Sequence, residues 1–209
     1  MNLFKTHAPA IIAISALALA LAGCSSSPQQ IHADSDTAGT SAGLDYRDCQ
    51  AVAKAMLQDL FRSQRLVRPD GTRYSITVGA ILNDTKIRDF RSDQIMWTIE
   101  QELENSGQVA VNSAVSSDKN NVNTDIYAVR ELRGDAEFNQ ASIAQQGSLQ
   151  APTLGISGKI FESPQQIGGK VRIEYWIQLK ITDLKGGHDI WRKQEIILKQ
   201  GSKGQMKLR

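Results

Sequence analysis

Hydrophobic and polar residues alternate along three long runs in the second half of the chain. A period of two is typical of strands with one buried face. The runs are Thr153–Phe161, Val171–Asp183 and Ile190–Lys199, and they are separated by Gly168-Gly169 and by Lys185-Gly186-Gly187. Short glycine-rich turns between consecutive strands predict an antiparallel three-strand meander.

In the first half of the chain, hydrophobic residues recur at three- and four-residue steps, which indicates amphipathic helices. Leu44–Arg62 has this pattern, and a second such helix starts with Ser92 as its N-cap and ends at Gly107. The strands Tyr74–Leu82 and Val109–Val111 flank the second helix. This strand, helix, strand order predicts a parallel pair with a right-handed crossover.

The segment before the meander is more polar. Ser116–Thr124 is predicted to be loop, and Asp125–Arg133 and Glu137–Gln146 are predicted to be two helical pieces broken at Gly134. The whole pattern predicts an α/β (α+β) fold with a mixed four- to five-stranded sheet. In it, a βαβ unit precedes the C-terminal antiparallel three-strand meander, and the helices pack on the sheet.

The N-terminus has the pattern of an export signal. Lys5 precedes an apolar run, Ala8–Ala22, whose roughly 15 residues fall short of the about 20 that a membrane-spanning helix needs. Leu21-Ala22-Gly23-Cys24 resembles the lipobox of bacterial lipoproteins, which implies that Cys24 is lipidated and becomes the mature N-terminus. Ser25 in place of aspartate implies sorting to the outer membrane, facing the periplasm.

These features divide the chain into three parts. Residues 1–23 are predicted to be the signal peptide, 24–43 a lipidated flexible tether, and 44–209 a single globular domain. The tether is rich in Ser, Gln, Asp, Thr and Gly, a composition that does not support a folded core. Fully stretched, about 19 such residues reach only about 65 Å.

Charge and composition argue against several classes of ligand. The chain has 24 basic and 22 acidic residues, and loss of the signal peptide removes only Lys5, so no nucleic acid or other polyanion is expected as a partner. Once Cys24 is lipidated, Cys49 is the remaining cysteine, so no intramolecular disulfide is expected. Cys49 falls on the apolar stripe of the first helix, where a buried thiol is expected instead of a reactive one.

No catalytic, metal or cofactor motif stands out, so the chain is not expected to be an enzyme or to have a small-molecule substrate. Its histidines lie apart from any suitable nucleophile or zinc-binding cluster. Gly168-Gly169-Lys170 lacks the spacing of a phosphate loop. The carboxylates of Glu100, Glu102 and Glu104 are interpreted as the solvated face of a helix.

Trp176 stands on the polar face of its strand, among Arg172, Glu174, Gln178 and Lys180. Either a helix covers this face and buries the indole, or the ring is exposed as an anchor for a partner. The first interpretation is favoured, because the predicted helices need a sheet face on which to pack.

Several of these segments together resemble the LpoB family of penicillin-binding-protein activators. They are Asn83-Asp84-Thr85, Leu103-Glu104-Asn105-Ser106-Gly107 with Val109-Ala110-Val111, Leu154-Gly155-Ile156-Ser157-Gly158, and Asp183 to Trp191. The resemblance implies a domain like the N-terminal domain of TolB that binds the regulatory domain of a class A penicillin-binding protein and raises glycan polymerisation and crosslinking. It also implies that the partner-facing residues are Arg133, Asp135, Glu137, Phe138 and Gln140.

The tether departs from the family pattern. Enteric members resemble this chain in the folded domain but carry a much longer Pro-rich tether. Either the helix Leu44–Arg62 adds length, or the partner projects further, or this chain serves another envelope partner. The alternative function is a structural or secretion-assembly envelope lipoprotein with the same fold and no synthase-activating role.

Overall fold

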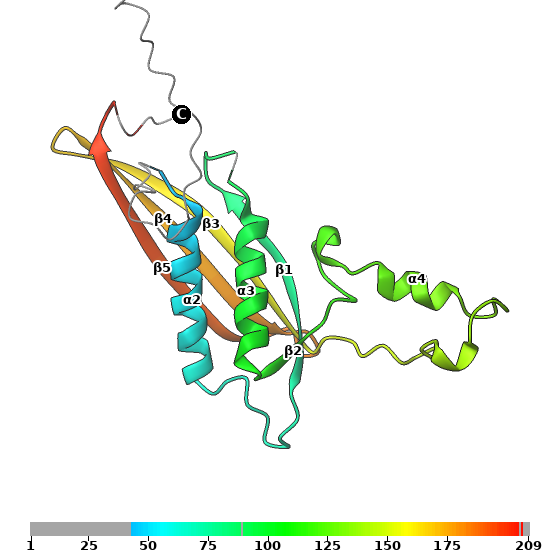
Figure 1. Cartoon of the computed structure of the whole chain (residues 1–209). Helices are drawn as coiled ribbons and strands as arrows, with labels where there is room; N and C mark the ends of the chain where they lie inside the picture. Colours follow the sequence, from blue (N-terminus) through cyan, green and yellow to red (C-terminus); the bar gives the residue numbers. More distant parts are fainter. Residues whose placement is uncertain (1–42, 89, 205, 207–209) are drawn as a thin grey trace, which may run out of the picture. The chain divides into compact units, whose positions relative to one another are not determined.

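The computed structural model describes residues 43–88, 90–204 and 206 (Figure 1). The predicted signal peptide, the lipobox with Cys24 and the predicted tether lie outside the described residues. The described elements are α2 (Tyr46–Arg62), β1 (Tyr74–Asp84), α3 (Ser92–Ser106), β2 (Val109–Val111), η3 (Lys119–Asn121), α4 (Asp125–Glu131), η4 (Gln140–Ser142), β3 (Leu154–Ile167), β4 (Lys170–Asp183) and β5 (Asp189–Ser202).

The five strands form one mixed sheet in the order β2-β1-β3-β4-β5. β1 is parallel to both β2 and β3, whereas β3, β4 and β5 are antiparallel. This topology confirms the predicted fold class, including the βαβ unit and the C-terminal meander. Gly168 and Gly169 form the turn between β3 and β4, because Ile167 pairs with Lys170, and their φ angles are 54° and 79°.

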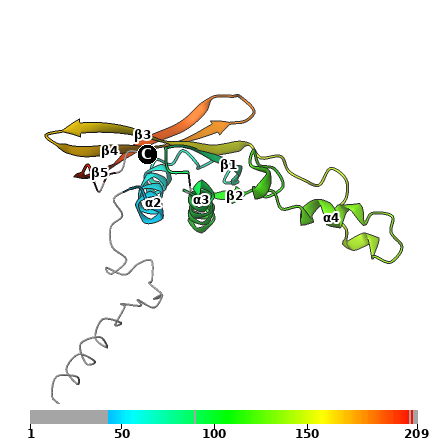
Figure 2. The same cartoon turned by 90° about the horizontal axis from the view of Figure 1, so that it is seen from above.

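Both long helices pack on the same face of the sheet (Figure 2). At the start of α2, the Asp45 carboxylate accepts a hydrogen bond from the Asp48 amide (3.0 Å), and Asp48 Oδ2 accepts one from the Asp45 amide (3.2 Å). This reciprocal cap satisfies two amides that the helix itself leaves unpaired. α3 ends at Gly107, whose φ of 64° is the left-handed conformation that glycine favours.

The core lies between this sheet face and the two helices. The buried face of β4 consists of the alternating residues predicted for it, and α2 and α3 add Met56, Leu57, Leu60, Ile95, Ile99 and Leu103. Burying each of these large side chains contributes about 1.5–3 kcal/mol before the cost of ordering the chain. Two ion pairs fasten α2 along β5: Lys199 with Asp48 (2.6 Å) and Lys193 with Asp59 (3.5 Å).

Cys49 is fully buried in this core, as predicted. Burial is the main cause that raises the pKa of its thiol to about 12. Because the thiolate is the nucleophilic form, the folded protein holds this cysteine in its unreactive state.

Some predicted elements differ from the structure in their bounds or in their type. Arg91, not Ser92, is the N-cap of α3. The predicted helix Glu137–Gln146 is only the short turn η4. β3 does not end at Phe161 but continues through Pro164 to Ile167. Because β1 ends opposite Phe161, this last part of β3 pairs with β4 alone. A proline, which has no amide hydrogen to donate, is tolerated in such an edge position.

Candidate partner-binding surfaces

Residues 112–153 connect β2 to β3 and form an arm whose helix α4 extends away from the sheet (Figure 1). The base of the arm follows the edge of β1: the Asn112 amide donates to the Ile76 carbonyl (2.8 Å), and Ser116 Oγ donates to the Val78 carbonyl (2.7 Å). Asn112 Nδ2 also donates to the Gln150 carbonyl (2.9 Å), which joins the two ends of the arm. The arm is thus fixed at its base and projecting at its tip.

The arm contains the five residues that the family resemblance marked as partner-facing. Gln140 is the centre of its hydrogen bonding: Oε1 accepts from the Gly134 amide (2.9 Å), and Nε2 donates to the carbonyls of Leu132, Asp135 and Phe138. Arg133 Nε donates to the Ala144 carbonyl (2.9 Å), and Asp135 Oδ1 accepts from the Glu137 amide (3.0 Å). Arg133, Asp135 and Gln140 therefore shape the tip.

Apolar side chains lie exposed along the same arm. Phe138 is 46% exposed, and Tyr127, Val129 and Leu149 are exposed to a similar degree. α4 buries none of its residues. A shallow hollow of about 350 Å³ lies between α4 and the returning chain, lined by Tyr127, Arg130, Glu131, Arg133, Gln146, Gly147 and Leu149. Exposed aromatic residues beside arginines are typical of protein-binding surfaces.

Gln140→Ala is expected to loosen the tip without changing the stability of the core. The variant loses the bond from the Gly134 amide and the contacts of Nε2, whose two protons are shared among three carbonyls, while α4 and η4 lie outside the core. A typical hydrogen bond has a net contribution of about 0.5–1.5 kcal/mol. Amide hydrogens of residues 132–146 should exchange about tenfold faster or more, with an unchanged melting temperature. Gln145→Ala, in the same segment, is the control. Equal exchange in the two variants would contradict the assigned role of Gln140.

α2 and α3 leave the other face of the sheet uncovered, and we call it the helix-free face (Figure 2). Trp176 alternates with the buried residues of β4 and therefore belongs to this face. The favoured interpretation, that a helix covers this indole, was wrong, because α2 and α3 both pack on the opposite face. The ring instead stacks on Phe161 of β3, with centroids 6.0 Å apart and planes 2° from parallel. It is half-buried by its strand neighbours, which include Ile196 of β5.

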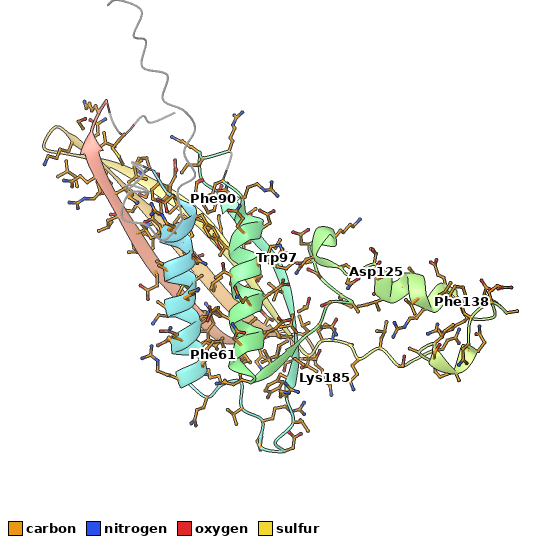
Figure 3. All side chains as sticks on the ribbon, in the orientation of Figure 1. Phe61, Phe90, Trp97, Asp125, Phe138 and Lys185 are labelled. Carbon is orange, nitrogen blue, oxygen red and sulfur yellow. The ribbon has the colours of Figure 1, made fainter. Side chains whose placement is uncertain are left out.

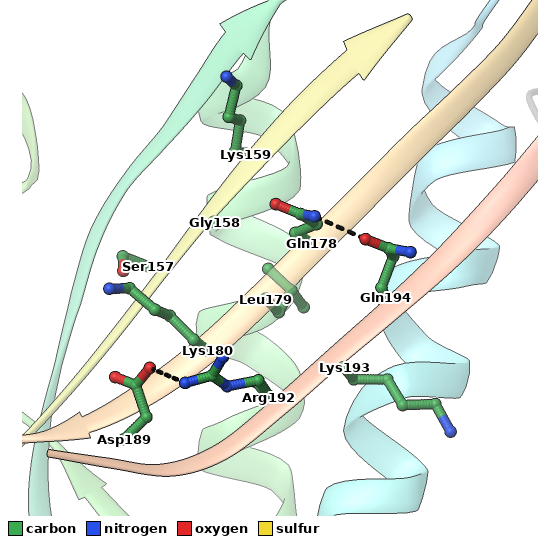
Figure 4. Close-up of a pocket in the computed structure, with 10 residues that line it drawn as sticks. All are labelled: Ser157, Gly158, Lys159, Gln178, Leu179, Lys180, Asp189, Arg192, Lys193 and Gln194. Carbon is green, nitrogen blue, oxygen red and sulfur yellow. Dashed lines mark hydrogen bonds and ion pairs between the residues drawn. The ribbon is translucent and has the colours of Figure 1, made fainter. Parts of the chain in front are cut away.

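A hollow of about 650 Å³ lies on the sheet and is lined by residues of β3, β4 and β5 (Figure 4). Two of its lining residues, Lys159 and Gln178, are each two positions along the strand from Phe161 and Trp176. Lys159, Lys180 and Arg192 line it, together with a Gln178–Gln194 side-chain hydrogen bond of 2.6 Å. Lys159 is paired with Asp84 (2.6 Å) and Arg192 with Asp189 (2.9 Å), so these acids offset part of the positive charge. The helix-free face is thus apolar at Trp176 and weakly basic next to it.

The structure brings the five arm residues together but places Trp176 on a different surface. Trp97 was not among the predicted site residues, although it is 67% exposed on α3 and lines a groove with Glu100 and Glu104. The available signal was its position: Trp97 lies three and seven residues before these glutamates, on the polar side of a helix.

In the described part of the chain, no three His, Cys, Asp or Glu residues are grouped so that they could hold a metal ion. None of the described helices is long and apolar enough to cross a membrane. These observations concern residues 43–88, 90–204 and 206 alone.

The family described as peptidoglycan-synthase activator LpoB matches residues 48–197. Among solved structures, the C-terminal domain of LpoB from Escherichia coli is 13% identical with a TM-score of 0.40, over 72% of this chain and 98% of that one. The corresponding Salmonella enterica domain is 14% identical with a TM-score of 0.37, over 74% and 98%. Lipoprotein GNA1162 from Neisseria meningitidis is 13% identical with a TM-score of 0.33, over 61% and 84%. Comparison with the curated proteins gives no match.

Proposed function

The chain belongs to the LpoB family of peptidoglycan-synthase activators, and we propose that it is an outer-membrane lipoprotein that binds and activates a class A penicillin-binding protein. The observation that carries this proposal is the family match, which runs from α2 into β5. In this role the chain acts as a protein ligand and catalyses nothing itself. It must bind the active conformation of the synthase more tightly than the resting one, since only differential affinity shifts a population.

The arm is the first proposed contact with the synthase. Phe138 supplies an exposed aromatic side chain at the tip, and Arg133, Asp135, Glu137 and Gln140 surround it in a hydrogen-bonded frame. Such a frame reduces the entropy that the tip loses on binding. Trp176 is the second proposed contact. It lies on the helix-free face, so its contribution is tested separately.

Purified chain is expected to raise the rate at which a class A synthase from the same organism polymerises glycan strands. Phe138→Ala should weaken binding by about tenfold or more, as truncation of a central aromatic anchor does. The control is Val67→Ala, which truncates an apolar side chain that is 58% exposed in the loop between α2 and β1. Binding without any change in synthase rate at saturation would contradict activation. Equal affinity of wild type and Phe138→Ala would contradict the arm as the contact.

The proposed lipid anchor is tested at Cys24. Cys24→Ala removes the thiol that takes the diacylglyceryl group, so the variant is expected to accumulate with its signal peptide uncleaved and without acyl chains. Metabolic labelling with palmitate and mass spectrometry of the N-terminus measure both changes. Cys49→Ala provides the matched control and should be labelled and processed like wild type. Unaltered labelling of Cys24→Ala would refute the anchor.

A further inference from the structure

A groove of about 620 Å³ runs between α3 and the base of the arm, and nothing in the proposed function uses it. Tyr46 of α2, three residues of α3 and two residues at the base of the arm contribute to its lining; the α3 residues are Trp97, Glu100 and Glu104, and the arm residues are Asn121 and Asn123. Figure 3 shows Trp97 on the side of α3 that faces the segment before α4. The groove therefore opens on the same side as the arm.

The walls of the groove are held in place by hydrogen bonds. Asn121 Nδ2 donates to Glu100 Oε1 (2.5 Å) and to the Val78 carbonyl (3.3 Å), and so ties the arm to both α3 and β1. On the far side of the arm segment, the Asn123 amide donates to the Ser113 carbonyl (2.8 Å). The groove is thus formed before any ligand enters it, which lowers the entropic cost of binding.

The chemistry of the lining favours a cation. It includes two carboxylates and two aromatic rings, and none of the described residues that line the groove is Lys, Arg or His. An exposed indole attracts a guanidinium or ammonium group through the negative face of the ring, and Trp does so most strongly. Desolvation and the nearby charge of Glu104 both raise the pKa of Glu100, so a cation placed here would relieve an existing repulsion.

We propose that this groove is the docking site for an Arg or Lys side chain of the protein partner, held over the indole of Trp97 and against the carboxylates of Glu100 and Glu104. The inference rests on the proposed function to the extent that the partner is the synthase. It assigns the partner a basic docking residue, and it extends the partner-facing surface from the tip of the arm to its base.

The direct test follows the indole N–H of Trp97 by NMR in the full mature chain, with its signal assigned by its loss in Trp97→Phe. Two probes are titrated: an alanine–arginine–alanine peptide amide, and the same peptide with neutral citrulline in place of arginine. The Trp97 signal is expected to move with the arginine peptide alone, and the movement should be lost in Glu100→Gln/Glu104→Gln. Equal movement with both peptides, or none with either, overturns the inference whether or not a synthase binds. Movement with a chitin oligosaccharide in place of the arginine peptide assigns the groove to glycan and also overturns it.

The second test measures affinity for the class A synthase. Glu100→Gln/Glu104→Gln is expected to weaken binding by about tenfold and to reduce its salt dependence, because two charged contacts are removed. Trp97→Ala should weaken binding similarly, whereas Trp97→Phe should retain part of the affinity. Glu195→Gln, which neutralises a carboxylate on β5 across the sheet, is the charge control and should bind like wild type. Absence of binding by the wild-type chain counts against the proposed function and leaves the peptide titration to decide the groove.

Discussion

Replacing Ile177 with alanine is expected to lower the free energy of unfolding by about 2–5 kcal/mol. Ile177 is fully buried at the middle of β4, and β4 is hydrogen-bonded to a strand on each side. The sheet therefore cannot close the cavity left by the missing atoms. The loss is a large part of the roughly 5–15 kcal/mol that stabilises a typical domain. Urea denaturation followed by circular dichroism measures it.

Ile196→Ala is the matched control for this prediction. Ile196 stands on the neighbouring strand β5 but points to the helix-free face, where it is 44% exposed. The same truncation there should cost less than about 1 kcal/mol, because little apolar surface is removed from the core. Similar losses in the two variants would contradict the assignment of the buried face.

Gly158→Ala is expected to cost about 1–3 kcal/mol through overpacking. A Cβ atom at this position would lie 2.6 Å from the Gln178 carbonyl oxygen and 2.7 Å from Leu179 Cδ2. The carbonyl belongs to the main chain of β4, so the contact is relieved only if β3 and β4 shift apart. That shift disturbs the pairing on which the sheet depends, and denaturant titration should register it as a lower midpoint.

Gly204→Ala tests whether this cost arises from the close contact or from the loss of glycine in general. No heavy atom outside its immediate neighbours lies within 4 Å of a Cβ at Gly204. Its stability should stay within about 0.5 kcal/mol of wild type. A Gly158→Ala variant as stable as Gly204→Ala would show that the neighbouring strand accommodates the methyl group.

Periodicity was sufficient to predict the sheet and the two helices that cover it. Alternation from Val171 to Ile181 identified the buried face of β4 residue by residue. The glycines after α3 and between β3 and β4 marked real chain reversals, since both positions have positive φ. These predictions succeeded because burial of a regular element imposes a repeating pattern on the sequence.

Prediction from hydrophobic periodicity failed at the arm tip and at Trp176. A period of two tells which residues share a face, but not which of the two faces the helices choose, and so Trp176 was placed under a helix. In the predicted helix Glu137–Gln146, the side chain of Gln140 donates to the Phe138 carbonyl, which a helix would have paired with a main-chain amide four residues later. Polar residues in a short segment are compatible with a helix or with an irregular turn, and the tertiary contacts of the segment decide between the two.

The groove at Trp97 could not be predicted for a related reason. Its second wall comes from Asn121 and its neighbours, which reach α3 only because the segment after β2 turns along the edge of β1. On sequence alone, Glu100 and Glu104 belong to a solvated helix face. The fold adds the opposing wall and, with it, the partial desolvation of Glu100.

The hydrogen bond between Asn112 and Gln150 bears on how far the length of the arm can change without disturbing the sheet. The two ends of the projecting segment meet there, and its outer part, residues 125–149, lies outside the hydrophobic core cluster of the domain. Doubling the length of a flexible loop costs only about 0.6 kcal/mol. A change in the length of residues 125–149 is therefore expected to leave the register of the strands beneath the arm unchanged.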